Sequence, residues 1–266
     1  MTPAFDFYIL IPCYNNFAGL RRSLQSVVYP MDKYGVVIVD DGSDEPISAS
    51  ALGNCIPPMT RIIRQPENTG ITAALNAGLR WLDGRGDHRF VARLDCGDIC
   101  TPERFTRQVS YLTLNPEIAL LGTWVRFENF ATGSSYLYKT PVEQREIQRG
   151  MHFRNLFIHP SVMWRASGRS GVNRYPYDLP HAEDYGFFYK IVLQGRAAIL
   201  PEVLTICEIN PEGLSFRNRR QQLVSRIKTV LRYGNNKLLG SVGALKLLLL
   251  LLIPYRVILT LKSIIW

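Results

Sequence analysis

Strand-like and helix-like segments alternate along the first 114 residues, and this alternation constrains the fold more than any other feature. Short apolar runs of strand length are followed by segments whose apolar residues recur at helical spacing. The expected strands are 7–12, 34–40, 60–65 and 89–95, and the expected helices are 18–28, 71–82 and 101–114. The pattern predicts an α/β fold with a doubly wound, mostly parallel sheet covered by helices on both faces.

Polar clusters follow the four expected strands at the point where each strand ends. Their sequences are CYNN, DDGSD, PENTG and DCGD. In open α/β sheets, ligands bind beyond the carboxyl ends of the strands. We therefore expect the four loops to converge on one binding site.

The remainder of the chain is less regular, but it continues the same domain. At 266 residues and 47% hydrophobic composition, the chain fits one large α/β domain better than two independent ones. A strand at 118–127, a hairpin near 132–138 and a short helix within 141–151 are expected. The last segments expected are a strand start at 159–165, a helix at 182–195 and a strand at 197–209.

The cysteines predict neither disulfides nor a zinc site, because they are odd in number and lack paired spacing. We interpret them as small, reduced side chains of a cytosolic protein. The five cysteines are Cys13, Cys55, Cys96, Cys100 and Cys207. The N-terminal apolar run has no basic segment before it, so it is expected to be a first strand and not a signal peptide.

Two carboxylates stand close together after the fourth strand, at Asp95 and Asp98. Such groups repel each other unless a cation lies between them. Mg²⁺ or Mn²⁺ accepts one or two carboxylates and takes its other ligands from phosphate oxygens and water. The alternative is a loop in which Asp95 caps the following turn and Asp98 is solvated.

Two further clusters suit a nucleotide. Asp40 and Asp41 stand where an acceptor could hold a base N–H or a ribose hydroxyl, although an Asp-Gly turn explains them equally well. Asn68 and Gly70 precede an expected helix, whose N-terminus is a natural place for a diphosphate. Here the alternative is a simple helix cap by Asn68 or Thr69.

Taken together, these segments resemble the family 2 glycosyltransferases of GT-A fold, which are inverting enzymes that use nucleotide-sugars. The resemblance covers roughly residues 5 to 215. It implies a catalytic domain at 1–215, with a nucleotide-sugar-binding half at 1–127 and an acceptor half at 128–215. The segments that carry it are ILIPCYNN, VVIVDDGSD, PENTGITAALNAGL, ARLDCGDICTPERFTRQ, IALLGTW and HAEDYGFF.

The resemblance implies roles in donor binding. Pro12, Tyr14 and Asp41 would line the base and ribose pocket with Asp40 beside them, and Arg93 would approach the diphosphate. Asp95 would take the first place of the Asp-x-Asp metal motif. The sequence departs from that motif at its second place, which is Gly97. Either Asp98 reaches an Mg²⁺ or Mn²⁺ ion, or Asp95 and the diphosphate hold it.

The resemblance also implies an acceptor site. Asp184 would deprotonate the acceptor hydroxyl, with Glu183 orienting it or binding the acceptor. The alternative is that both acids only favour a helix N-terminus. His159 would contact the acceptor. Residues that would neutralise the departing nucleoside diphosphate, or else face anionic lipid, are Arg217, Arg219 and Arg220.

The C-terminal tail carries the whole excess of positive charge. The formal net charge is +9, and the residues from 213 onward contain ten Lys or Arg and no Asp or Glu. Lys246, Pro254 and later basic residues interrupt the apolar stretch 238–266, which favours an in-plane or hairpin-like anchor over a spanning helix. We expect 216–266 to form basic and hydrophobic membrane-associating helices. The alternative is helices that pack on the catalytic domain or on a partner subunit.

These features lead to one expected function. The protein would be an inverting glycosyltransferase, peripheral or monotopic at the cytoplasmic face of the bacterial inner membrane. It would pass one sugar, most readily from a UDP-hexose, to a lipid-linked saccharide during O-antigen, capsule or exopolysaccharide assembly. Gln-x-x-Arg-Trp, which the resemblance links to processive synthesis, is absent from the sequence.

Two alternatives remain at this stage, a nucleotidyltransferase and a non-catalytic membrane-docked scaffold that keeps the fold. Nucleic acid is not expected as a partner, because the tail is aliphatic where base stacking requires aromatic side chains. The sequence predicts no oligomeric state.

Overall fold

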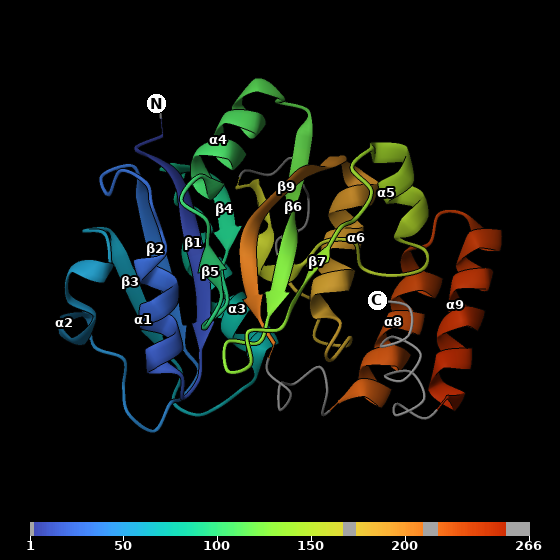
Figure 1. Ribbon diagram of the computed structural model, residues 1–266, viewed down its shortest axis with the longest axis horizontal. Coiled ribbons are helices and arrows are strands. Elements are labelled where there is room, and N and C mark those ends of the chain that lie inside the picture. Colours follow the sequence, from blue (N-terminus) through green and yellow to red (C-terminus); the bar gives the residue numbers. More distant parts are fainter. Residues whose placement is uncertain (1–2, 167–173, 210–217, 254–266) are drawn as a thin grey trace.

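A computed structural model describes residues 3–166, 174–209 and 218–253 of the chain. Strand and helix alternate through its first half as the sequence predicts (Figure 1). The strands are β1 (Phe5–Cys13), β2 (Tyr34–Asp40), β3 (Thr60–Arg64), β4 (His88–Arg93), β5 (Ile99–Cys100), β6 (Ile118–Glu128), β7 (Ser135–Tyr138), β8 (Met163–Arg165) and β9 (Arg196–Glu208). The helices are α1 (Phe17–Gln25), α2 (Ala49–Leu52), α3 (Ile71–Leu82), α4 (Arg104–Leu114), α5 (Gln144–Gly150), α6 (Glu183–Gln194), α8 (Arg219–Tyr233) and α9 (Lys237–Leu252).

The described strands form one sheet in the order β3-β2-β1-β4-β8-β6-β9-β5, with β7 paired to β6. β3, β2, β1 and β4 pair in parallel, and so do β6 and β9. β8 joins the two parallel groups by antiparallel pairing with both β4 and β6. The predicted α/β fold with a mostly parallel sheet is confirmed, and a short antiparallel strand connects its two parts.

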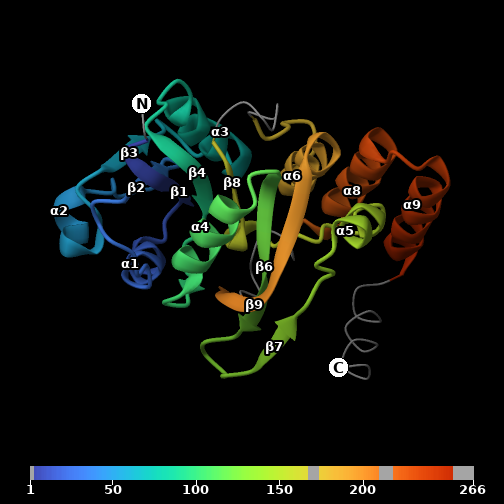
Figure 2. The same ribbon diagram turned by 90° about the horizontal axis from the view of Figure 1, so that it is seen from above.

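Helices cover both faces of the sheet and bury two separate cores. β1 shows the arrangement, because Phe7 and Ile9 belong to one core while Tyr8 and Leu10 belong to the other. Alternate residues of a strand point to opposite faces, so a strand buried on both sides is apolar throughout. Figure 2 shows α1 and α4 on one face and α3 and α6 on the other.

One predicted helix start is wrong, and the cap considered for a second helix is not found. α4 begins at Arg104 after Glu103, so Thr101 is not its cap; the Thr101 carbonyl instead accepts from the Arg104 N–H in a turn. α3 begins after Gly70, which has φ +87° and no capping side chain, so neither Asn68 nor Thr69 caps it.

The two C-terminal helices pack on the catalytic domain, as the alternative for the tail describes. Leu223 and Val230 of α8 and Leu247 of α9 join the core that contains α6. Gly243 lies so close to the domain that a Cβ there would stand 1.9 Å from the carbonyl oxygen of His152. Among the described residues, no helix has the length and apolar character needed to cross a membrane. Residues 254–266, which the expected anchor includes, lie outside the described residues.

Candidate active site

A cavity of about 600 Å³ lies beyond the carboxyl end of β4 and receives side chains from both parts of the sheet. The loop after β4, the start of α6, the end of β9 and the hairpin of β6 and β7 all contribute to its walls. Its lining is rich in carboxylates that are far apart in sequence, namely Asp95, Asp98, Glu183, Asp184 and Glu208. The predicted metal-binding and catalytic carboxylates therefore share one cavity.

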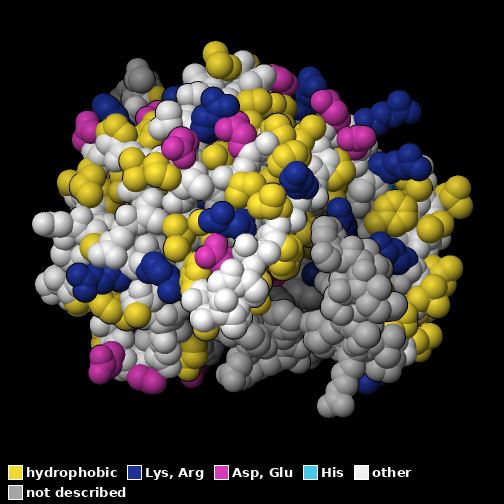
Figure 3. Space-filling view, viewed as in Figure 1, with side chains coloured by type: hydrophobic (Ala, Val, Ile, Leu, Met, Phe, Trp, Pro, Cys, Tyr) yellow, Lys and Arg dark blue, Asp and Glu magenta, His cyan; other side chains and the backbone are white. Residues whose placement is uncertain are grey.

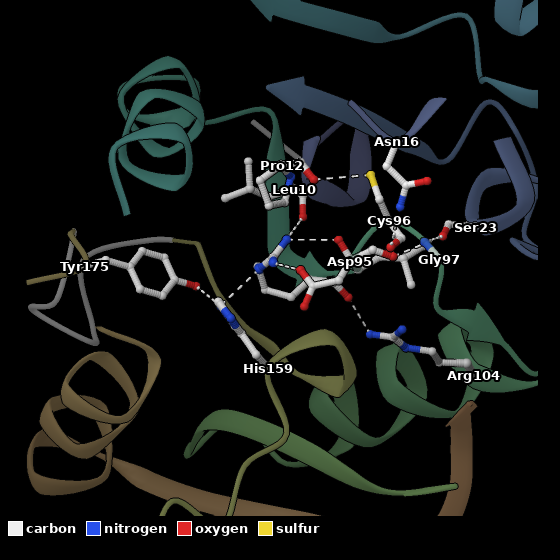
Figure 4. Close-up of polar contacts among 12 residues, drawn as sticks. Leu10, Pro12, Asn16, Ser23, Asp95, Cys96, Gly97, Arg104, His159 and Tyr175 are labelled. Atoms are coloured by element: carbon white, nitrogen blue, oxygen red, sulfur yellow. Dashed lines mark hydrogen bonds and ion pairs between the residues drawn. The ribbon is translucent and has the colours of Figure 1, made fainter. Parts of the chain in front are cut away.

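Helix α1 fixes the loop that carries Asp95. The Ser23 hydroxyl donates to the Asp95 carbonyl over 3.0 Å and accepts from the Gly97 N–H over 2.9 Å. Asn16 caps α1 through its side-chain oxygen, and its amide nitrogen donates to the Cys96 carbonyl over 3.3 Å. The contacts that Ser23 and Asn16 make with this loop hold it against the first helix; Figure 4 shows both side chains beside the loop.

Arg93 is fully buried beneath Asp95 and pairs with its carboxylate. It also donates to the carbonyls of Leu10 and Leu94 and, through Nε, to His159 Nε2 over 3.1 Å. The guanidinium of Arg93 is therefore engaged within the protein, and its expected approach to a diphosphate stays a prediction. Its charge serves to hold Asp95 at the cavity wall, where that side chain is 32% exposed.

His159 belongs to the same buried network (Figure 4). Because an arginine N–H only donates, His159 Nε2 is the acceptor and the neutral ring carries its proton on Nδ1. Tyr175 lies 3.0 Å from the same nitrogen through its hydroxyl. Burial and the neighbouring Arg93 lower the pKa of His159 to about 3. His159 lines the cavity as a neutral residue with this nitrogen engaged, which differs from the expected acceptor contact.

Asp98 is buried and turned toward β9, where its carboxylate accepts the Glu208 N–H over 2.8 Å. Burial, followed by the charge of Asp95, raises the pKa of Asp98 to about 8. Asp98 therefore differs from the solvated side chain of the alternative interpretation. It ties the end of β9 to the loop after β4.

Glu183 and Asp184 open helix α6 and face the cavity. The Asp184 carboxylate accepts from Asn155 Nδ2 over 2.9 Å and from the Tyr185 N–H over 2.7 Å. Burial raises the pKa of Asp184, although the nearby Arg226 and these two hydrogen bonds oppose the increase. Burial and the charge of Asp184 raise the pKa of Glu183 to about 8. Both acids are thus less acidic than ordinary carboxyl groups, as suits a general base.

The opposite wall contains residues that the sequence analysis does not single out. Phe127, Tyr136 and Tyr138 come from the hairpin of β6 and β7, with the rings of Phe127 and Tyr136 stacked 5.2 Å apart. Arg154 lies over the Tyr138 ring at 5.3 Å. α8 adds Gln222 and Arg226. Tyr136 and Tyr138 alternate in the expected hairpin, and this pattern could have predicted an aromatic wall.

A second cavity of about 390 Å³ lies between the loops after β1 and β2. Asn15 joins the two loops, because its side chain donates to Asp44 over 3.0 Å and accepts the Asp44 N–H over 2.9 Å. Ser43 accepts the Asn15 N–H over 3.0 Å. The sequence clusters CYNN and DDGSD contain these residues, but the individual roles of Asn15, Ser43 and Asp44 are not predicted from them.

Asp40 and Asp41 both serve the backbone of this region. Asp40 accepts from the N–H groups of Ser43 and Ile47 and pairs with Arg64 over 2.6 Å. Burial alone would raise the pKa of Asp40, but these hydrogen bonds outweigh burial and lower it. The Asp40 carboxylate is therefore engaged within the protein, and its expected place beside the base and ribose pocket stays a prediction.

Asp41 fills the place expected for a diphosphate. Its carboxylate accepts from the Thr69 N–H over 3.0 Å, from the Thr69 hydroxyl over 2.9 Å and from the Gly70 N–H over 2.9 Å. The amides before a helix favour an anion, and this chain supplies one itself. Asn68 is exposed beside this contact. The Gly70 N–H and the Asp41 carboxylate are therefore engaged with each other, and their expected roles in nucleotide binding stay predictions, as does that of Asn68.

The remaining predicted residues are spread out. Pro12 is half-buried at the end of β1, and Tyr14 is 48% exposed in the loop that follows. Arg219 donates to the Leu250 carbonyl over 2.5 Å, which joins α8 to α9 in place of the expected anion contact. Arg220 is exposed on α8, and Arg217 lies outside the described residues.

Comparisons with known proteins agree with this geometry. The family model of "Glycosyl transferase family 2" matches residues 8–176. "Amylovoran biosynthesis glycosyltransferase AmsE" of Erwinia amylovora is 34% identical over 74% of this chain and 74% of its own length. An Escherichia coli "UDP-Gal:alpha-D-GlcNAc-diphosphoundecaprenol beta-1,3-galactosyltransferase" is 26% identical over 85% of this chain and 82% of its own.

Solved structures share the fold. Residues 1–349 of S. aureus TarS superpose with a TM-score of 0.66 at 16% identity, covering 92% of this chain and 71% of that chain. The mannosyltransferase PcManGT of Pyrobaculum calidifontis, in complex with GDP-Man and Mn²⁺, gives a TM-score of 0.65 at 18% identity. It covers 92% of this chain and 69% of that chain. With the family match over more than half of its length, the chain belongs to glycosyl transferase family 2 and is a nucleotide-sugar-dependent glycosyltransferase.

Proposed function

We propose that the protein is an inverting glycosyltransferase that moves one sugar, from a UDP-hexose, to a lipid-linked saccharide in surface polysaccharide synthesis. The observation that carries this proposal is that Asp95, after β4 in the proposed donor half, and Asp184, in the proposed acceptor half, line one cavity. When a hydroxyl displaces a nucleoside diphosphate, a cation stabilises the leaving diphosphate and a general base accepts the proton of the hydroxyl. The boundaries proposed for the two halves remain 1–127 and 128–215.

In the proposed reaction, Asp184 accepts the proton of the acceptor hydroxyl as its oxygen bonds to the anomeric carbon. The bond from that carbon to the diphosphate oxygen breaks on the opposite face, and its electron pair leaves with the nucleoside diphosphate. Asn155 and the Tyr185 N–H hold the carboxylate in place. The raised pKa of Asp184 increases its basicity, which favours proton transfer near neutral pH.

The lining of the cavity fits a divalent cation. Among residues 3–166, 174–209 and 218–253, no three His, Cys, Asp or Glu side chains are grouped to hold an ion. Mg²⁺ or Mn²⁺ needs only one or two carboxylates when a diphosphate supplies further oxygens. Glu183 Oε2 is buried without a hydrogen-bond partner in the part of the chain that the structure describes, so the cavity has an unsatisfied polar atom. A bound cation would neutralise the charge that develops on the leaving diphosphate.

The names of relatives support the proposed substrates. TarS is known in complex with UDP and with UDP-GlcNAc. The E. coli relative carries a diphosphoundecaprenol acceptor in its name, and AmsE carries amylovoran biosynthesis in its name. On the basis of these names, we propose a uridine nucleotide, a lipid-linked acceptor and a role in polysaccharide synthesis for this protein. The aromatic wall at Phe127 and Tyr138 offers flat apolar surface for the sugar rings.

Turnover by this protein is expected to release UDP and to require a divalent cation. UDP release would be measured from UDP-glucose, UDP-galactose and UDP-GlcNAc with undecaprenyl diphosphate-linked GlcNAc, first with Mn²⁺ and then after EDTA. We expect release from one donor and its loss on chelation, since the leaving charge would then lack its cation. No release from any donor would favour the scaffold, and undiminished release after EDTA would remove the cation from the proposal.

We propose that α9 places the enzyme on the cytoplasmic face of the inner membrane. Its outward face is a row of exposed apolar side chains at helical spacing, namely Leu238, Val242, Leu245, Leu249 and Leu252. Figure 3 shows hydrophobic side chains, with basic side chains beside them, at the right edge where α9 lies. Lys237 and Lys246 are exposed on the same helix. An apolar row flanked by cations suits anionic lipid.

Charges on this row are expected to release the protein from lipid. A double Leu245→Glu and Leu249→Glu variant should bind vesicles of phosphatidylglycerol and phosphatidylethanolamine at least about 10-fold more weakly, because each buried leucine contributes roughly 1.5–3 kcal/mol. Co-sedimentation of the full chain measures this. The control is Leu114→Glu on α4, a still more exposed leucine on the other face of the sheet. Equal sedimentation of both variants would contradict membrane docking by α9.

A further inference from the structure

Gly97 stands where the Asp-x-Asp pattern would carry its second carboxylate, and the structure shows why no side chain fits there. Its φ is +109°, a conformation that L side chains rarely adopt. A Cβ at this position would stand 2.5 Å from Glu208 Oε2 and 3.2 Å from Arg22 Nη2. The space that belongs to a side chain at position 97 is therefore filled by the carboxylate of Glu208.

Glu208 is held in that place from several sides. Arg22 Nη2 pairs with Glu208 Oε2 over 2.5 Å, and Arg22 Nε donates to the Gly97 carbonyl over 3.2 Å. The guanidinium also lies over the Phe130 ring at 4.7 Å, which limits its movement. From the backbone side, the Glu208 N–H donates to Asp98. The carboxylate is therefore oriented by a second residue, as carboxylates that bind metals commonly are.

Glu208 and Asp95 both line the main cavity, and both side chains are about one third exposed. Asp98, in contrast, is buried and engaged with the Glu208 N–H. The two carboxylates that remain accessible to a ligand beside Gly97 are thus those of Asp95 and Glu208. They flank the loop whose second motif position has no side chain.

An independent feature indicates that this cavity receives a polar ligand. Glu183 is 6% exposed and lines the cavity, and its Oε2 has no hydrogen-bond partner among the described residues. A buried polar oxygen without a partner is destabilising. Such a group in a wall that already holds Asp95 and Glu208 is unfavourable unless a bound ligand compensates it.

We propose that Glu208 supplies the second carboxylate of the divalent-cation site, in place of the side chain that is missing at position 97. Asp95 supplies the first, and Arg22 is a positioning residue that orients Glu208. The proposal rests on the proposed function, because the nucleoside diphosphate and water provide the remaining oxygens. It replaces the earlier alternatives in which Asp98, or the diphosphate with Asp95 alone, completes the site.

The test measures the Mn²⁺ affinity of the full-length protein in the presence of UDP. The electron paramagnetic resonance signal of free Mn²⁺ reports how much of the ion is bound. Glu208→Gln should weaken Mn²⁺ binding by at least about 10-fold, a typical loss for groups that tune a metal site. Asp95→Asn should weaken it at least as much. Arg22→Met should weaken it less, because it removes only the orientation of Glu208.

The matched control is Glu128→Gln. Glu128 is the cross-strand partner of Glu208, pairs with Arg126 over 3.1 Å, and is not in the cavity wall. Its Mn²⁺ affinity should equal that of the wild type within about 2-fold. Circular dichroism and the unfolding midpoint of each variant would exclude misfolding, and Glu208→Asp, which keeps the charge, should retain more affinity than Glu208→Gln.

The possible results separate this inference from the proposed function. Wild-type Mn²⁺ affinity in Glu208→Gln, or no Mn²⁺ binding by the wild type with UDP, overturns the role of Glu208. UDP release by the wild type in the same preparation would then still support the glycosyltransferase reaction. Absence of UDP release together with a Glu208-dependent Mn²⁺ site would instead contradict the proposed reaction and keep the cation site.

Discussion

Asp184→Asn is expected to lower kcat at least about 10²-fold while leaving the fold intact, because the amide cannot accept the proton of the acceptor hydroxyl. Asparagine keeps the shape of the side chain and its oxygen still accepts from Asn155 or from the Tyr185 N–H. The pH dependence of kcat in the wild type should show an ascending limb above the ordinary aspartate pKa of about 3.9. We expect kcat to increase with pH because the base must be ionised, and burial raises the pKa of Asp184.

The measurement is steady-state UDP release with saturating donor and acceptor between pH 5 and 9. Asp178→Asn is the control, since Asp178 precedes the same helix, pairs with Arg232 at the surface and is absent from the cavity wall. Its kcat should stay near the wild-type value. A kcat for Asp184→Asn within a few fold of the wild type would show that another group takes the proton, and Glu183 is the next carboxylate in the cavity.

Arg93→Met is expected to lower the free energy of unfolding by about 3–5 kcal/mol. Arg93 has no solvent exposure, and its guanidinium satisfies the buried Leu10 carbonyl, the Leu94 carbonyl and Asp95. Removing one partner of a buried ion pair costs about this much, and each buried acceptor left without a donor adds to the loss. Urea denaturation followed by tryptophan fluorescence would measure the change.

Arg89→Met is the matched control on the same strand. Arg89 pairs with Asp6 over 3.0 Å but is 32% exposed, so its loss should cost no more than about 1 kcal/mol. Equal stability of the two variants would show that the network beneath Asp95 does not hold the fold. Unchanged stability of Arg93→Met together with weaker UDP binding would support the diphosphate contact that the sequence suggested.

Local sequence patterns predicted the fold well because they depend on near neighbours. The strand at 34–40 and the helix at 71–82 are confirmed with their predicted bounds, since both are apolar segments bounded by turn residues. The predicted start of α4 and the capping residues considered for α3 were wrong, because capping preferences are weak compared with tertiary contacts. At α3, Asp41 already supplies the anion that a capping side chain would have offered.

The candidate site was predicted less completely, because its geometry depends on contacts between distant segments. Sequence order brought attention to Asp95 and Glu183, and the structure places both in one cavity. The sequence did not predict that Arg93 would be buried and paired with Asp95, or that the Glu208 carboxylate would occupy the space beside Gly97. Those partners lie on other strands, and no spacing rule within one segment relates them.

The uninterrupted sheet has a consequence for how the enzyme handles its substrates. β8 is hydrogen-bonded to β4 on one side and to β6 on the other, so the two parallel parts of the sheet, proposed to bind donor and acceptor, share one ladder. A hinge between them would have to break these backbone hydrogen bonds, which buried strands seldom do. The scaffold therefore sets the spacing between the proposed base and the proposed donor site, and we expect rearrangements during a catalytic cycle to involve side chains and connecting segments.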